Sequence, residues 1–338
     1  DLTYEEYLDF HRRYYHPVNS YIYLYGDMDI EERLEWMDQH YLKDFPAIAL
    51  DSSIDVQKPF KEIKKLETEY AVSENEACED KTYYSYAAAM DITLDVKVCK
   101  AFEVLAYILV EMPGAPLKQA LLDAGIGTDI DVDFCDILRQ SYFCITTQNA
   151  KAGDREKFYN IIMDTLRQQV EDGLDSKALE AAINAMEFKE READYGMFPK
   201  GLVYGLNTMK TWLYDDNMPY NALCFQECYE FLRSQLNTGY YESLLRKYLL
   251  ENTHAVLVEM KPKKGLQALA EQKEKDRLAK YKASLSEEEI SKLIDDTKAL
   301  KAYQEEPSPK EILEKIPMLS REDIGKKIAP VYNKECSL

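Results

Sequence analysis

The chain has 338 residues, of which 46% are hydrophobic, and a formal net charge of −20 at pH 7. The hydrophobic content excludes a disordered chain, and the length allows two domains with ordinary cores. The acidic balance argues against nucleic acid and anionic membranes as partners, and it favours simple solubility or the attraction of basic peptides. No apolar run is long enough to span a membrane and no secretory leader is present, so we expect a cytoplasmic protein. The chain begins at Asp1 and not at Met, and we expect a piece of a longer polypeptide.

The seven cysteines give no metal-binding or redox motif. Their number is odd, no two form a CxxC pair, and only Cys224 and Cys228 have a spacing of interest, one helical turn apart. We interpret them as reduced, mostly buried thiols of a cytosolic protein. They are Cys78, Cys99, Cys135, Cys144, Cys224, Cys228 and Cys336.

Residues 1–50 have the pattern of a helix, a strand and a second helix. The first helix begins at a capping box, Leu2–Glu6, and ends at Pro17. Ser20–Tyr25 alternates aliphatic residues with tyrosines, which predicts a strand, and Asp29 caps the second helix. The apolar stripe of this helix, predicted to be buried, consists of Ile30, Leu34, Met37 and Tyr41. We interpret the segment as the end of a first α/β domain whose other strands are missing.

Residues 51–260 predict a second α/β unit. A polar connector at 46–58 leads into an extended segment at 59–72. Strands are predicted at 82–90, 129–134, 141–148 and 254–260. Helices are predicted at 95–112, 116–124, 154–172, 175–195, 201–213, 220–236 and 239–251, with Asp95, Asp154 and Asp175 as N-caps. Runs of helices separated from paired strands predict the α+β class, with a sheet covered by helices mainly on one face.

Residues 261–306 predict a polar helical hairpin that serves as a linker. The second helix opens with a capping box at Ser286–Glu289, and Pro307 follows its end. The first helix, Leu266–Ser284, is expected to lie antiparallel to it. A hairpin this polar usually bridges two bodies and packs lightly on both. The remaining residues, 307–338, are too few for a domain, and we expect the start of a following one.

The sequence offers no residues from which to assemble a catalytic, cofactor-binding or metal site. The four histidines lie at His11, His16, His40 and His254, and no HxxEH, GxGxxG, GxxxxGK[ST] or GxSxG motif occurs. Histidines on helix faces beside tyrosines usually serve packing. Asp129, Asp131 and Asp133 alternate on one face of a strand. They would suit a cation or a basic peptide, but an exposed edge or a solvated face is the favoured interpretation.

Four groups of residues, in chain order, match the motifs of one known family. They are Tyr14–Ser20 with Gly26–Asp27, Ala115–Leu121 with Gly125–Gly127, Glu187–Gly196 with Pro199–Gly201, and Ser284–Glu289. Together they resemble the pitrilysin/insulinase family of zinc metallopeptidases, and the last two resemble its presequence-protease-like subfamily. The resemblance covers essentially the whole chain.

The resemblance implies a chamber that digests peptides between two halves, each built of two related α/β domains. It implies zinc held by an inverted HxxEH motif and a later Glu of the first domain, with substrate contacts from the last domain. This chain has neither, so we expect the end of domain one at 1–50, a non-catalytic domain two at 51–260, the hairpin linker at 261–306 and the start of domain three at 307–338. Zinc is expected only in the missing first-domain site of the parent. The expected partners are the remaining domains of the same polypeptide and the peptide substrates of the parent.

We therefore expect the non-catalytic central portion of a zinc-dependent oligopeptide-degrading metalloendopeptidase, which forms chamber wall and hinge and is catalytically silent alone. The alternative is part of an inactive family member that serves as a structural or peptide-binding subunit. An intact or a degenerate HxxEH upstream distinguishes the two. A third hypothesis, an unrelated α/β binding protein, predicts a second unit without a sheet covered by helices on one face.

Overall fold

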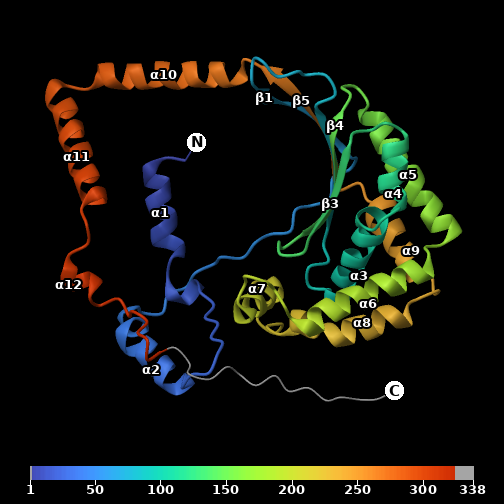
Figure 1. Ribbon diagram of the computed structural model, residues 1–338, viewed down its shortest axis with the longest axis horizontal. Coiled ribbons are helices and arrows are strands. Elements are labelled where there is room, and N and C mark those ends of the chain that lie inside the picture. The colour runs from blue at the N-terminus through green and yellow to red at the C-terminus, as the bar shows by residue number, and fades with distance from the viewer. Residues whose placement is uncertain (1, 324–338) are drawn as a thin grey trace. The chain divides into compact units, whose positions relative to one another are not determined.

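The structure is a computed structural model that describes residues 2–323 (Figure 1). They fall into two compact units, the first ending at Gln267 and the second beginning at Ala268. Among these residues, no helix joins the length to the apolarity that crossing a membrane requires. Cys336, and the predicted domain start from residue 324 onward, lie outside the described residues.

The N-terminal segment contains two capped helices. Helix α1, Tyr4–Tyr14, begins at a capping box in which the Thr3 hydroxyl accepts the Glu6 N–H and the Glu6 carboxylate accepts the Thr3 N–H at 2.8 Å. Helix α2, Ile30–His40, begins at Asp29, whose side chain accepts the N–H of Glu32 at 3.0 Å. Short 3₁₀ turns follow the helices at Pro17–Asn19 and Leu42–Asp44. The predicted starts of both helices are therefore confirmed.

Two predictions for this segment are wrong. Residues 20–25 are extended, but they are not a strand, because within residues 2–323 no strand pairs with them. The stripe of α2 that was predicted to be buried is open, with Ile30 and Leu34 exposed by 45% and 51%. An amphipathic helix buries its stripe only where another element covers it, and periodicity cannot supply that element.

A five-stranded sheet forms the centre of the second α/β unit, in the order β1-β5-β2-β4-β3. The strands are β1 Lys64–Val72, β2 Thr82–Met90, β3 Asp129–Cys135, β4 Ser141–Ala150 and β5 Ala255–Lys264. β1 and β5 run parallel, and the other neighbours run antiparallel. The register places Tyr86 opposite Ile145 on one side and Leu257 on the other. All four predicted strands are confirmed, and the extended segment at 59–72 contains β1.

The helices of this unit gather on one side of the sheet in Figure 1. They are α3 Val96–Ala106, α4 Pro116–Asp123, α5 Arg155–Asp172, α6 Ser176–Glu192, α8 Phe225–Ser234 and α9 Tyr240–Leu245, with α7 Lys200–Trp212 beyond them. Single π turns at Tyr107–Glu111 and Arg246–Leu250 extend α3 and α9. The predicted α+β class is confirmed. The one-sided cover contradicts the hypothesis of an unrelated binding protein.

Two of the three predicted N-caps close their helices. Asp95 accepts the N–H of Val98, and Asp175 accepts those of Lys177 and Ala178. Asp154 precedes α5 but accepts no helix N–H, so this prediction is wrong. Its ψ of 12° departs from the extended backbone from which an N-cap side chain reaches the helix.

Aromatic side chains join the helices to the covered face of the sheet. Tyr84 stacks on Phe158 of α5 at 5.7 Å between ring centroids, and Phe102 of α3 meets Phe143 at 5.9 Å. The Tyr86 hydroxyl donates to the carbonyl of Leu249 at 3.1 Å, so this buried oxygen is satisfied. Each such ring contributes about 1.5–3 kcal/mol through burial. These contacts fix which face of the sheet is closed.

The second unit consists of polar helices without buried side chains. It contains most of α10, Leu266–Ser284, then α11, Glu287–Glu305, and α12, Lys310–Leu313. The capping box of Ser286 and Glu289 is confirmed. Figure 1 shows α10 and α11 meeting at an angle, so the predicted antiparallel packing is wrong. Their apolar side chains meet only at the junction, which we call the elbow: Leu278, Tyr281, Leu285, Ile290, Leu293 and Ile294.

Replacing Gly127 by valine should destabilise the first unit by at least about 3 kcal/mol. Gly127 has a φ of +74°, and a Cβ there would overlap the Thr147 side chain and the Gln148 carbonyl of β4. Gly125→Ala is a matched control, because Gly125 also has a positive φ, +68°, but nothing lies within 4 Å of the added carbon. Urea unfolding measures both. Equal losses would show that the close approach to β4 does not matter.

Replacing Ile294 by aspartate should loosen the elbow and leave the α/β unit folded. Ile294 is 50% exposed, so the change should cost only about 1 kcal/mol. Ala299→Asp, at an exposed position of α11 outside the elbow, is the control. Limited proteolysis within 285–306 reports on the elbow, and near-ultraviolet circular dichroism reports on the aromatic core. Simultaneous loss of both signals would mean that the elbow is integral to the core.

Candidate functional site

The face of the sheet opposite the helices carries small, half-buried side chains. On β2, Ser85, Ala87 and Ala89 occupy this face, whereas Tyr84 and Tyr86 are fully buried on the other. Their cross-strand neighbours here are Cys144, Thr146, Val256 and Val258. We call this surface the open face. Side chains this short leave a broad, shallow surface, which suits a wall better than an enclosed site for a small molecule.

A row of carboxylates lies along one edge of the open face. Asp129, Asp131 and Asp133 alternate on β3, which pairs only with β4 in the sheet, and all three are exposed. The Tyr142 hydroxyl donates to Asp133 at 2.7 Å. Alternate residues of a strand lie roughly 7 Å apart, too far for three carboxylates to share one cation. This acidic edge can attract positive charge, but it is not built as a metal site.

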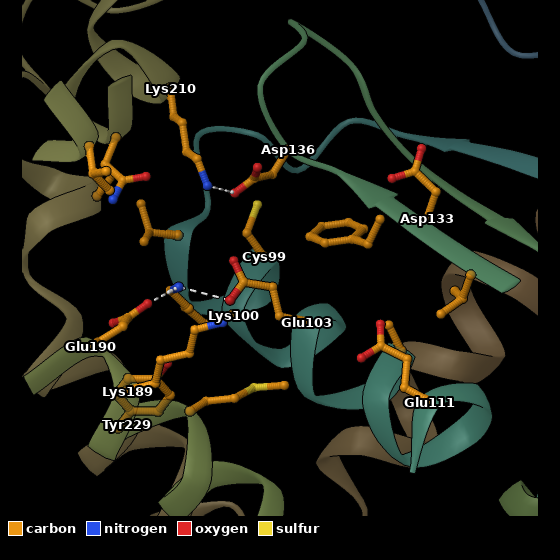
Figure 2. Close-up of a pocket in the computed structure, with 18 of the residues that line it drawn as sticks. Cys99, Lys100, Glu103, Glu111, Asp133, Asp136, Lys189, Glu190, Lys210 and Tyr229 are labelled. Carbon is orange, nitrogen blue, oxygen red and sulfur yellow. Dashed lines mark hydrogen bonds and ion pairs between the residues drawn. The ribbon is translucent and has the colours of Figure 1, made fainter. Parts of the chain in front are cut away.

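A charged cavity of about 540 Å³ lies among α3, β3, α6 and α7 (Figure 2). Lys100 of α3 is 12% exposed and donates to Glu103 at 2.8 Å and to Glu190 at 2.5 Å. Lys210 of α7 pairs with Asp136 at 2.9 Å on another wall of the cavity. The ion pairs therefore tie helices from distant parts of the sequence to one another.

The electrostatics of the cavity hold its groups in unreactive forms. Burial alone would lower the pKa of Lys100, but the carboxylates of Glu103 and Glu190 outweigh it and raise this pKa. Burial raises the pKa of the Cys99 thiol. Neither side chain is therefore a nucleophile at neutral pH. Glu190 Oε2 and the Tyr229 hydroxyl are buried without hydrogen-bond partners, and a polar cavity of this size can supply water to them.

The four histidines have separate, local roles. His11 stacks on Tyr15 at 4.4 Å between centroids, and His16 Nδ1 accepts the N–H of Val18 at 3.1 Å. His40 Nδ1 lies 2.9 Å from the Trp36 carbonyl, and His254 Nε2 lies 3.3 Å from Gln57 Oε1. Within residues 2–323, no three His, Cys, Asp or Glu side chains are grouped so as to hold a metal ion. The residues present do not fit zinc.

Cys224 and Cys228 do not form a reactive pair. Both are free thiols, Cys224 exposed and Cys228 buried. Burial raises the pKa of Cys228 to about 11, so it stays protonated at neutral pH. Cys224 Sγ donates weakly to the Tyr220 carbonyl at 3.6 Å.

The charged cavity is the feature that the sequence analysis missed. Its one local signal is the pair Lys100 and Glu103, three residues apart in a helix that is otherwise mainly apolar. Glu190 and Lys210 follow far along the chain, and only the fold brings them to Lys100 and Asp136.

Two family models match the chain. The model described as peptidase M16 inactive domain matches residues 1–186, and a model of the segment associated with subfamily C of the M16 peptidases matches residues 260–337. Protein HypA of Clostridium perfringens is 42% identical over 99% of this chain and 34% of its own length. Presequence protease 1, chloroplastic/mitochondrial, of Arabidopsis thaliana is 33% identical over 98% of this chain and 31% of its own length. The chain thus spans about a third of these relatives.

Solved structures match the fold at low sequence identity. A protease from Helicobacter pylori has a TM-score of 0.57 at 14% identity, and the match covers 78% of this chain and 59% of that one. A peptidase M16 inactive domain from Pseudomonas fluorescens has a TM-score of 0.56 at 17% identity over 78% and 58% of the two chains. These two matches concern the fold alone.

Replacing Lys100 by methionine should destabilise the first unit by about 3–5 kcal/mol at pH 7.5. The change leaves Glu103 and Glu190 facing each other without their cation, which raises their folded pKa above the unfolded value. A carboxyl with a raised folded pKa favours folding at low pH and loses this effect as pH rises, so the deficit should shrink at pH 5. Urea unfolding at both pH values measures it. Lys97→Met, at an exposed position of the same helix, is the control, and a deficit independent of pH would contradict the ion-pair explanation.

Proposed function

Because the chain belongs to the peptidase M16 family, in its presequence-protease-like branch, we propose that it is the non-catalytic central portion of a zinc-dependent oligopeptide-degrading metalloendopeptidase. The match to an inactive-domain model and the lack of a site that fits zinc within residues 2–323 support this proposal. The zinc site would lie in an earlier domain of the parent polypeptide. The domain boundaries at 1–50, 51–260, 261–306 and 307–338 and a cytoplasmic location remain predictions.

The role we propose for the second α/β unit is to form wall of a peptide chamber. The observation that carries this role is the open face, whose short side chains leave a broad surface beside the exposed carboxylates of β3. A wall of this kind accepts peptides of many sequences, because it offers few deep side-chain pockets. The partners are then the remaining domains of the same polypeptide and its peptide substrates.

The role we propose for α10 and α11 is a hinge. Neither helix has a buried side chain, and the elbow is the place where their apolar residues meet. Elements with few buried contacts are the ones that change position at low cost. A capping box at Ser286 keeps α11 helical while the angle at the elbow changes.

Basic peptides are the substrate class that the charge favours. Several relatives are named presequence proteases. Targeting segments of mitochondria and chloroplasts are rich in Arg and poor in acidic residues. A chain with a net charge of −20 would attract such peptides over a distance of about a Debye length.

The second candidate function, part of an inactive family member that acts as a structural or peptide-binding subunit, rests on the same inactive-domain match. The sequence upstream of residue 1 distinguishes the two. An intact HxxEH motif with a later Glu supports the peptidase, and a degenerate motif supports the scaffold.

We expect the purified chain to leave a mixture of quenched fluorescent peptides uncleaved and to contain no stoichiometric zinc. The parent polypeptide, assayed in parallel, should cleave them in a chelator-sensitive way. Chelator-sensitive turnover by the chain alone would contradict the proposal. It would mean that His11, His16, His40 or His254 contributes to a metal site.

A basic peptide should bind the chain more weakly as salt rises, whereas an uncharged peptide of equal length should respond little. Asp129→Asn together with Asp131→Asn should weaken the basic peptide about threefold at low salt, since exposed charges contribute a few tenths of a kcal/mol each. Asp295→Asn with Asp296→Asn in α11 changes the net charge equally and is the control. Fluorescence anisotropy measures the affinities. Equal effects of the two variants would exclude a special role of the acidic edge.

A further inference from the structure

The extended residues 20–25 lie against α7 through three tyrosines at every second position. Tyr25 meets the helix at Gly201, and Tyr23 meets it at Gly205. Tyr21 lies edge-on to Trp212, with 4.6 Å between ring centroids. Segment and helix therefore run in opposite directions, and the tyrosines face one side of α7.

The spacing of the tyrosines fits the spacing of the helix. Alternate residues of an extended chain lie about 6.7 Å apart, and helix positions four apart are separated by about 6 Å along the axis. Tyr23 and Tyr25 therefore meet Gly205 and Gly201 in step. Trp212 lies two turns further on, and helical side chains lean toward the N-terminus, which brings its ring back to Tyr21.

The two glycines are explained by this contact and not by the helix. Neither has a positive φ, and alanine forms helices more favourably than glycine. A Cβ at Gly201 would overlap the Tyr25 ring, and one at Gly205 would lie 2.9 Å from Tyr23 Cδ1 and Cε1. Two glycines in one helix thus make room for two aromatic rings. We call the side of α7 that carries them the glycine face.

Further contacts hold the tyrosines in place. The Tyr21 hydroxyl donates to Asp216 at 2.9 Å. Tyr25 packs edge-on against Tyr204 of α7 at 6.0 Å between centroids. Burial at the helix raises the pKa of both Tyr21 and Tyr23. Gly205 itself is buried.

We propose that the glycine face of α7 is the docking surface that attaches the N-terminal segment to the second α/β unit. Its occupant is residues 20–25 of this chain, an extended segment with an aromatic side chain at every second position. The connector at 46–58 has no regular structure, so it tethers the segment but does not orient it. The docking orients it. This inference stands on geometry and does not depend on the proposed peptidase function.

The test uses the full chain with Trp36→Phe, which leaves Trp212 as its one tryptophan. Gly205→Leu should release Tyr21 from Trp212, because the leucine side chain takes the place of the Tyr23 ring. We expect about a twofold rise in the acrylamide quenching constant of Trp212 as its covered side opens. Chymotryptic cleavage within 20–25 should accelerate in parallel.

The sign of the effect separates docking from helix propensity. Leucine favours helix over glycine, so Gly205→Leu should slow hydrogen exchange in α7 if propensity alone mattered. The docking predicts instead that residues 20–25 are released while amides of β2 and β4 keep their protection. Unchanged quenching and cleavage in Gly205→Leu would overturn the proposal.

Two further variants keep the test decisive. Tyr23→Ala removes the ring without touching α7, and it should release the segment even if Gly205→Leu fails to fold. Leu206→Ala, at an exposed position of α7 that makes no contact with the tyrosines in the structure, should leave quenching and cleavage unchanged. A Tyr23→Ala variant that behaves as the parent chain would also overturn the proposal.

Discussion

One constraint organises the second α/β unit: every strand must turn one of its two faces toward the helices. On β2 this sends Tyr84 and Tyr86 inward, where their rings and hydroxyls bond the sheet to α5 and to the carbonyl of Leu249. The same alternation leaves Ser85, Ala87 and Ala89 on the other face. The open face is thus a consequence of how the core is packed. A fold that closes one side of its sheet this completely presents the other side to whatever lies beyond it.

The charge of the chain is divided between two environments. Exposed carboxylates, such as those on β3, dominate the surface and act at a distance. Inside the charged cavity, by contrast, Lys100 and Lys210 are matched to carboxylates at 2.5 to 2.9 Å. Buried pairs of this kind add little net stability, but losing one partner costs a great deal. They therefore specify how α3, α6 and α7 fit together more than they strengthen the fold.

The sequence predicted what is encoded locally and missed what depends on distant partners. Alternation in β2 and β4 and the caps at Asp95 and Ser286 rest on neighbouring residues, and the structure bears them out. The pairing partner of residues 20–25 and the cover for α2 would have to come from elsewhere, so periodicity overestimated both. The charged cavity was invisible because Lys100 and Glu190 lie ninety residues apart. No site residue was predicted, and the acidic edge emerged only as a row of exposed side chains.

Helix α7 connects these features because its two sides meet different neighbours. One side carries Gly201 and Gly205 against the tyrosines, and the other places Val203, Asn207 and Lys210 in the wall of the charged cavity. A rigid helix cannot shift on one side alone, since its backbone hydrogen bonds keep both faces in register. Displacing residues 20–25 would therefore strain the pair of Lys210 and Asp136. The attachment of the N-terminal segment and the integrity of the cavity are in this way two readings of the position of one helix.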